Sequence, residues 1–412
     1  MERKLINTIV KSDLMKKTEN ETLATFQEEI PSIYFSHKDK ATFDSYVKSA
    51  EYFYRDHFKF PKNMFNGVDL IDFGAGTGEN TIYLANWGAN CTLVEMNIKS
   101  QNISKKVFQK YALKPENHKF VLSSIFDYKP KDNTKYDIVH CRGVLSHTAA
   151  KELAFQHIST FLKPGGYLIF GDPNKAGGFQ NMLQRFAVYK FAKTPDEMVD
   201  ISEYFFKEDI DRSEKTIPRT RRAIIFDRWV IQSQDDPSVE EVRDWIKDAG
   251  LSFYSSYPNV IPNILGNSLL HINKFDPYLM HNLFSISEIV WMMQTSEDQV
   301  FIAEFNNIME QTAINLKSLS GLLSNFNSNS ILDSNKFNNI SNDLVESISK
   351  VDFLLPIKKK IKMFLKETRE FIDIVNTGNK EDVLKYIKQA SILFKGACGV
   401  RHVDFIAYKK EN

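Results

Sequence analysis

An acidic residue followed by three glycines at alternate positions is the feature of this sequence that points most directly to chemistry. The stretch reads VDLIDFGAGTGEN, with Asp72 ahead of Gly74, Gly76 and Gly78. Glycine adopts a positive φ at no steric cost and lets a ligand touch the backbone amides. The apolar run before the acid is typical of a strand buried on both faces. The sequence therefore predicts a ligand site at the end of a buried strand, in the first strand–turn–helix unit.

Two classes of nucleotide-like cofactor use such a turn. The dinucleotide fingerprint has the spacing G-x-G-x-x-G. Counted from Gly74, its third glycine would fall where this chain has Glu79. A carboxylate at a helix N-terminus would also repel a pyrophosphate bound there. The spacing therefore disfavours a nicotinamide-dependent oxidoreductase, while a Rossmann-like fold with another ligand, or with none, stays open.

A second acidic residue sits where a ribose would be bound. Glu95 ends the apolar run CTLVEM, about twenty residues after the first glycine. A carboxylate at a strand end can accept hydrogen bonds from both hydroxyls of a ribose. This signal fits NAD as well as other nucleoside cofactors, so it indicates a ribose without choosing the cofactor.

Several motifs in order resemble the class I S-adenosylmethionine (SAM)-dependent methyltransferases, in the small-molecule branch with a type 11/12 methyltransferase domain. The resemblance covers about residues 50–305, and its motifs are LIDFGAGTGENTIYLANWGANCTLVEMN, YDIVHCRGVLSHT and FLKPGGYLIFGDPN. It implies a Rossmann-like, seven-stranded, mostly parallel sheet with helices on both faces. It also implies SAM as the cofactor, whose sulfonium and zwitterionic tail accept acidic surroundings.

The resemblance also implies which residues hold SAM. These are Asp72, Gly74, Ala75, Gly76, Gly78, Glu95, Met96, Ser124, Ile125 and Cys141. The backbone near Cys141 is expected to hold the methionyl amino group. The family usually has an acid after the third strand that binds the adenine amino group, but here Ser124 stands at that position. Three alternatives stay open there: the Ser124 hydroxyl, the Ile125 amide, or a carboxylate supplied by Asp127.

Methyl transfer from a sulfonium is an in-line displacement, so the protein contributes mainly positioning. A general base helps when the acceptor is a hydroxyl or an amine. The candidates for base or for orienting the acceptor are His147, Asp172 and Asp227. Residues 174–237 are expected to form a helical lid that excludes water from the site.

The elements that must position these residues follow from the hydrophobic pattern. Apolar runs alternate with helical patterns between residues 68 and 172, which predicts right-handed βαβ units and a parallel sheet covered on both faces. Strands are expected at 68–73, 91–96, 119–125, 136–141, 167–173, 251–258 and 299–305, with a helix near 279–294. The apolar segment 400–408 competes with 299–305 for the role of last strand, as an edge strand.

Three regions are predicted along the chain. Residues 1–60 form an N-terminal helical segment, 61–305 the methyltransferase domain, and 306–412 a C-terminal helical region. The helices of the C-terminal region are expected to mediate homo-oligomerisation or to cover the acceptor site. An alternative function follows from them: a non-catalytic binding or assembly protein built on a methyltransferase fold.

Composition narrows the partners. The chain has 412 residues and a net charge of +1, which gives no reason to expect nucleic acid as a partner. Three scattered cysteines and the absence of a C-x-x-C motif argue against a disulfide framework or a metal site. There is no run of 18 apolar residues and no signal peptide, so we expect a cytoplasmic enzyme. Its acceptor would be a small molecule, such as a sugar, a lipid-linked precursor or another biosynthetic intermediate.

Overall fold

The computed structural model describes residues 13–30, 39–216, 219–231, 234–257, 298–323, 330–350, 355–395 and 402–411. The chain divides into two compact units. The first contains residues up to 174, residues 191–258 and residues 401–412, and the second contains residues 175–190 and 259–400.

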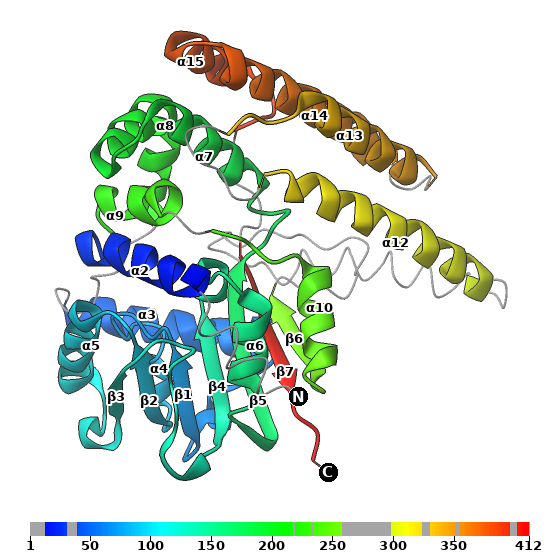
Figure 1. The fold of residues 1–412 in the computed structure, drawn as a ribbon. Coiled ribbons are helices and arrows are strands. Elements are labelled where there is room, and N and C mark those ends of the chain that lie inside the picture. Colours follow the sequence, from blue (N-terminus) through cyan, green and yellow to red (C-terminus); the bar gives the residue numbers. More distant parts are fainter. Residues whose placement is uncertain are drawn as a thin grey trace. The chain divides into compact units, whose positions relative to one another are not determined.

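A single seven-stranded sheet organises the first unit, with strand order β3-β2-β1-β4-β5-β7-β6 (Figure 1). Its strands are β1 (Asp69–Phe73), β2 (Asn90–Glu95), β3 (Lys119–Leu122), β4 (Tyr136–Arg142), β5 (Leu162–Pro173), β6 (Ser252–Tyr257) and β7 (His402–Tyr408). Strand β7 runs antiparallel to both of its neighbours, and the other strand pairs are parallel. The predicted seven-stranded, mostly parallel Rossmann-like sheet is confirmed.

Helices cover both faces of this sheet, because successive side chains of each strand point to opposite faces. The face-covering helices are α3 (Lys40–Tyr52), α4 (Ile82–Asn86), α5 (Ile98–Tyr111), α6 (Lys151–Ser159) and α10 (Val239–Asp248), while α2 (Asp13–Glu28) lies at the carboxyl edge. On one face, Ile169 and Ile406 join a core with residues of α3, α4 and α5. On the other, Phe170 stacks on Phe405 and meets Phe155 of α6, and α6 and α10 lie in front of the sheet in Figure 1.

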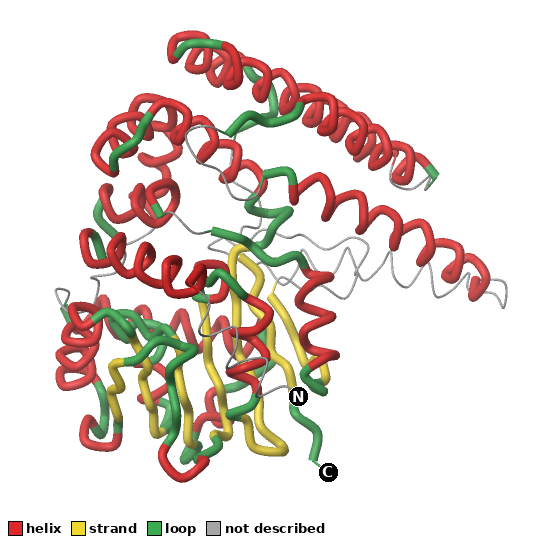
Figure 2. Tube along the Cα trace, in the orientation of Figure 1, coloured by secondary structure: helices red, strands yellow, loops and turns green. Residues whose placement is uncertain are grey.

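The last strand of the sheet is not formed by residues 299–305, the first of the two predicted segments. Residues 299–305 belong to the helix α12 (Asp298–Gly321), so the strand predicted there is wrong. A short apolar run does not by itself distinguish a strand from a buried helix. The competing segment forms β7, which lies between β5 and β6 rather than at an edge (yellow in Figure 2). The helix expected near 279–294 falls outside the described residues.

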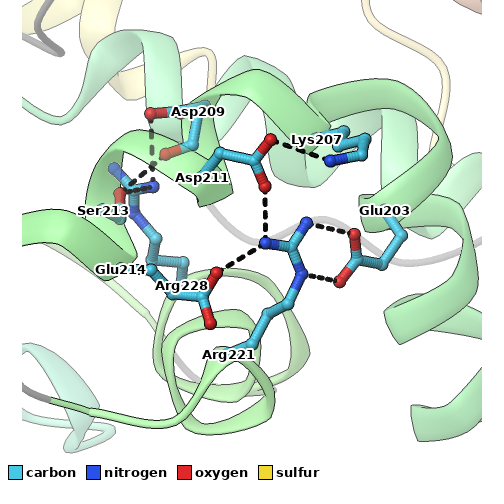
Figure 3. A network of polar contacts seen from close by, with 8 residues as sticks. All are labelled: Glu203, Lys207, Asp209, Asp211, Ser213, Glu214, Arg221 and Arg228. Atoms are coloured by element: carbon cyan, nitrogen blue, oxygen red, sulfur yellow. Dashed lines mark hydrogen bonds and ion pairs between the residues drawn. The ribbon is translucent and has the colours of Figure 1, made fainter.

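The insertion after β5 is helical, as predicted. It contains α7 (Phe179–Phe191), α8 (Pro195–Thr216), α9 (Arg221–Ile225) and the π-helix η6 (Phe226–Val230). Arg221 fastens α9 to α8 (Figure 3): its guanidinium is paired bidentately with Glu203 and also reaches Asp211 and Glu214, at 2.6 and 2.8 Å. These carboxylates come from both sides of the kink in α8 at Phe206, so one side chain ties α9 to both parts of α8.

The second unit is a set of consecutive helices, to which α7 also belongs. After α12 come α13 (Ser334–Ser349), α14 (Leu355–Thr377) and α15 (Lys380–Gln389), each packed on the next. The Glu367 carboxylate accepts hydrogen bonds from the backbone amides of Ser391, Ile392 and Leu393 and so ties the end of the helical run to α14. In the described part of the chain, no helix is both long and apolar enough to cross a membrane.

The position of β7 gives a test of the fold. Ile406 is 0% exposed within a central strand, so Ile406→Ala should lower the free energy of unfolding by about 2–5 kcal/mol in urea denaturation. Leu122→Ala is the matched control, because Leu122 is 53% exposed on the edge strand β3. The control should shift stability by less than about 0.5 kcal/mol. Equal, small effects of the two substitutions would contradict the placement of β7 in the core.

Candidate active site

The three glycines of the turn after β1 have three different surroundings. All have positive φ, at 65°, 54° and 78° for Gly74, Gly76 and Gly78. A Cβ on Gly74 would lie 2.4 Å from Val144, and one on Gly78 would lie 2.6 Å from Ser104 of α5. A Cβ on Gly76 would meet no atom within 4 Å. Gly74 and Gly78 therefore allow close packing of the protein, whereas Gly76 faces open space in which a ligand can touch the backbone.

A buried polar chain lies beneath this turn. Asp72 is 2% exposed; one of its carboxylate oxygens lies 2.7 Å from Nδ1 of His140 on β4, and the other accepts the hydroxyl hydrogen of Thr81, which precedes α4. The chain continues from Nε2 of His140 to the Tyr54 hydroxyl, 3.4 Å away. The Asp72 carboxylate is thus turned into the protein, where it ties β1 to β4 and to the start of α4.

Glu95 closes the turn from the neighbouring strand. Its Oε2 accepts the amide hydrogen of Gly76 at 2.8 Å, and its Oε1 accepts that of Asn97 at 2.7 Å. Burial raises the pKa of Glu95, while these two amides lower it. A carboxylate has about four acceptor positions, so Glu95 keeps capacity for further donors. It therefore links the glycine turn and the end of β2 into one binding surface.

The remaining predicted cofactor residues lie in the loops at the same edge of the sheet. Ala75 lies in the glycine turn, 7% exposed, and its amide donates to Val94. Met96 lies in the turn between Glu95 and α5, and Ser124 and Ile125 follow β3. The Ser124 hydroxyl oxygen accepts the amide hydrogen of Asp127 at 3.2 Å, which closes a tight turn after the strand.

Cys141 sits inside β4 and is 0% exposed, and burial raises the pKa of its thiol well above the ordinary value. Only its backbone can serve a ligand. Two residues later, Gly143 has a φ of 71°, and a Cβ there would meet no atom within 4 Å. Gly143 thus repeats at the end of β4 the open backbone of Gly76. Its position after a strand was a readable signal, but the sequence reasoning did not use it.

Two of the three predicted acid–base residues come together. Asp172 ends β5 and is 3% exposed. Its Oδ1 accepts the amide hydrogen of Ser146 at 2.9 Å, while its Oδ2 is buried without a hydrogen-bond partner among the described residues. Burial raises the pKa of Asp172, and the amide of Ser146, His402 and His147 act in the opposite direction. His147 follows Ser146 in the same short helix, η5 (Leu145–His147).

The third candidate, Asp227, lies on η6 of the insertion. Its carboxylate is ion-paired with Arg219, with Nη1 and Oδ2 3.0 Å apart and both side chains about one third exposed. This pairing gives Asp227 an evident structural role in fastening the insertion. Asp172 is therefore hydrogen-bonded to the residue that precedes His147, whereas Asp227 lies on a separate helix, η6.

Helix α2 lies over the carboxyl edge of the sheet, where it is dark blue in Figure 1. The Thr22 hydroxyl donates to the His147 carbonyl at 3.4 Å, and the Phe26 ring meets the His147 ring edge-on at 5.7 Å. The Asn97 side chain donates to the Phe26 carbonyl at 3.0 Å. The sequence reasoning expected a lid only from residues 174–237. No local motif in α2 shows that it would pack on the turns after β2 and β4.

A charged cluster at the ends of β4 and β7 also escaped the sequence reasoning. Arg142 donates to both carboxylate oxygens of Asp404, at 2.6 and 2.9 Å. Burial alone would raise the pKa of Asp404, but Arg142 and His402 hold it well below its ordinary value. The available signal was an acid inside the apolar run HVDFIAY, since a buried carboxylate is rarely left unpaired.

The surroundings of the glycines predict a graded series of stabilities. Gly76→Ala should cost about 1–2 kcal/mol, the strain of a left-handed residue. Gly67→Ala is the control, because Gly67 has a φ of 76° and equally open surroundings. Gly74→Ala and Gly78→Ala should each cost a further 1–3 kcal/mol or so, because their Cβ atoms overlap neighbours. Chemical denaturation of the four variants measures the series, and equal losses would contradict the packing around Gly74 and Gly78.

The raised pKa of Asp172 predicts how stability depends on pH. The folded state holds this proton more tightly than the unfolded state, so the contribution of Asp172 is greatest at low pH. It falls as the pH rises above about 4, the ordinary pKa of an aspartate, and on through the raised folded value. Asp172→Asn should therefore gain stability relative to the parent as the pH rises from 4 to 7 in urea titrations.

Asp137→Asn provides a control of opposite sign. Burial acts to raise the pKa of Asp137, but hydrogen bonds from Lys163 and from the Asp69 amide outweigh it and lower that pKa. The parent should therefore gain stability relative to the Asp137→Asn variant as the pH rises. The same pH trend for the two variants would contradict the assignment at Asp172.

Comparison with known proteins agrees with this geometry. Residues 46–195 match a family model described as a methyltransferase domain. The chain is 30% identical over 116 residues to the ubiquinone biosynthesis O-methyltransferase of Colwellia psychrerythraea, covering 28% of this chain and 46% of that protein. It is 30% identical over 112 residues to malonyl-[acyl-carrier protein] O-methyltransferase 2 of Ilyobacter polytropus, covering 27% and 42%. The matches thus span less than half of either relative.

Solved structures show a more distant likeness. The magnesium protoporphyrin IX methyltransferase of Synechocystis PCC 6803, solved with bound SAH, shares 15% identity over 61% of this chain and 91% of its own length, with a TM-score of 0.33. Together with the strand order and the glycine turn, the family model places residues 46–195 in the class I SAM-dependent methyltransferase superfamily.

Proposed function

We propose that this protein binds SAM at the carboxyl edge of its sheet and transfers the methyl group to a small-molecule acceptor. One observation carries the proposal: Gly76 presents open, left-handed backbone while its amide is held on the Glu95 carboxylate. The turn and the acid therefore form one preorganised surface. A dinucleotide suits it poorly, since Glu79 stands where a pyrophosphate would need the third glycine.

The residues present fit the parts of SAM. Glu95 has acceptor capacity left for the two ribose hydroxyls. Gly76 and Gly143 offer backbone with no side chain in the way, at the ends of β1 and β4, where the amino-acid tail would lie. Asp72 would act indirectly, by holding the turn through Thr81 and His140. Met96 and Ile125, in the turns after β2 and β3, would flank the nucleoside.

When bound, SAM supplies an electrophilic methyl group, so this chain's residues need only orient the acceptor and remove its proton. Asp172 is suited to the second task. The Ser146 amide holds one carboxylate oxygen, and the other is left to accept a proton. Burial raises the pKa of Asp172 toward neutral pH, and a general base is most effective when its pKa is near the working pH. His147 stands beside it and, with α2 packed against its ring, would help to exclude water.

The acceptor atom is proposed to be oxygen. The two relatives described above are named O-methyltransferases. A hydroxyl acceptor must lose a proton during transfer, and Asp172 provides a base at the edge where the acceptor would enter. Asp227, already paired with Arg219, would serve at the rim of the insertion rather than at the reacting atoms.

Isothermal titration with S-adenosylhomocysteine (SAH), the demethylated product, tests the proposal without knowledge of the acceptor. The parent should bind SAH, and Gly76→Ala should weaken binding by about tenfold or more, since its Cβ enters the space of the ligand. Gly67→Ala carries the same backbone strain away from the site and should bind as the parent does. No binding by the parent would overturn the proposal and favour a non-catalytic binding or assembly role. Unchanged binding by Gly76→Ala would contradict the role of the turn.

A further inference from the structure

Helix α2 carries an acidic side chain, Glu19, with one buried oxygen that the described residues leave without a hydrogen bond. The Oε1 atom of Glu19 is buried and has no hydrogen-bond partner among the described residues. An unpaired, desolvated carboxylate oxygen costs free energy unless something donates to it. Glu21, two residues later in the same helix, is exposed. Its Oε1 atom lies 3.8 Å from Nζ of Lys17, one turn earlier. Glu19 is therefore set apart from an ordinary surface acid of the same helix.

The groups around Glu19 place it at the end of β3. Burial raises its pKa; the Ser124 side chain lowers it by hydrogen bonding, the charge of Asp127 raises it, and Lys16 lowers it. Ser124 and Asp127 form the tight turn that follows β3. Asp127 itself is exposed, so its carboxylate is solvated, whereas the half-buried Glu19 brings one buried carboxylate oxygen to the same turn.

The strand order fixes which part of a nucleoside would reach this turn. The sheet runs β3-β2-β1-β4-β5. In the proposed function, on which this step rests, Glu95 at the end of β2 holds the ribose, and the reacting end points toward Asp172 on β5. The base, attached to the other side of the ribose, must then extend over β3. A hydrogen-bond donor on that base would meet the unpaired oxygen of Glu19.

We infer that Glu19 accepts a hydrogen bond from the exocyclic amino group of the cofactor's purine and thereby selects a 6-amino base over a 6-oxo base. The orphaned oxygen gains the donor it lacks. A 6-oxo base would instead turn a carbonyl oxygen toward a carboxylate, leaving two acceptors face to face. A site built to bond a donor rejects an analogue that lacks it far more strongly than a merely apolar pocket does.

The test compares SAH with S-inosylhomocysteine, which has oxygen in place of the 6-amino group, by titration calorimetry. The parent should prefer SAH by about tenfold or more, as expected for a hydrogen bond to a charged group. Glu19→Gln can turn an amide donor toward the 6-oxo group. The ratio of its affinities for SAH and S-inosylhomocysteine should therefore be about tenfold smaller than that of the parent, or be reversed. The ratio is measured within one variant, so a loss of folded protein affects both ligands equally.

Glu21→Gln is the matched control, with the same change of charge on the same helix, and it should keep the parent's ratio. If Glu19→Gln also keeps that ratio, or if Asp127→Asn changes it instead, the inference is wrong while the proposed function stands. If the parent binds SAH and S-inosylhomocysteine equally, the inference is likewise wrong. If the parent binds neither, the proposed function fails and the inference fails with it.

Discussion

The carboxylate of Asp72 is the interaction on which the site depends. Buried beneath the glycine turn, it joins β1 to His140 of β4 and to Thr81 at the start of α4. Removing one partner of a buried pair commonly costs about 3–5 kcal/mol, because the other is left unsatisfied. Here the loss would alter the geometry of the turn, since both contacts, to β4 and to the start of α4, are made by this one side chain. Glu95 holds the Gly76 amide directly, and Asp72 fixes the strand and the helix start on either side of the turn.

Function then follows from what the sheet brings to one edge. The turn after β1 and the acid that ends β2 form the surface proposed to bind the nucleoside of SAM, and the turn after β4 donates a hydrogen bond to the acid near the end of β5. Helix α2 covers this edge through contacts with the turns after β2 and β4. Its far end is tied to α9 by Arg222, which lies 3.2 Å from Glu28 and 3.8 Å from Glu29. Such exposed pairs contribute little stability, so the cover is fastened mainly by its packing.

The sequence predicted those parts of the site that are local in the chain, and it missed those that depend on distant segments. Glycine spacing and a strand-ending acid are physical requirements written into a few neighbouring residues, and they sufficed for the turn and for Glu95. The segments 299–305 and 402–408 are both short and apolar, and only pairing with β5 and β6 decides that the second is the strand. The approach of Glu19 to Ser124 is likewise a long-range packing event with no local signature. A truncation before residue 402, designed to remove only the C-terminal helices, would also remove β7.

A crystal structure of the protein grown with excess SAH tests the central claim most directly. The account predicts both ribose hydroxyls on the Glu95 carboxylate and the amino-acid tail against the backbone of Gly76 and Gly143. Density for SAH elsewhere, or a side chain filling the space beside Gly76 in a protein that has bound the ligand, would contradict it.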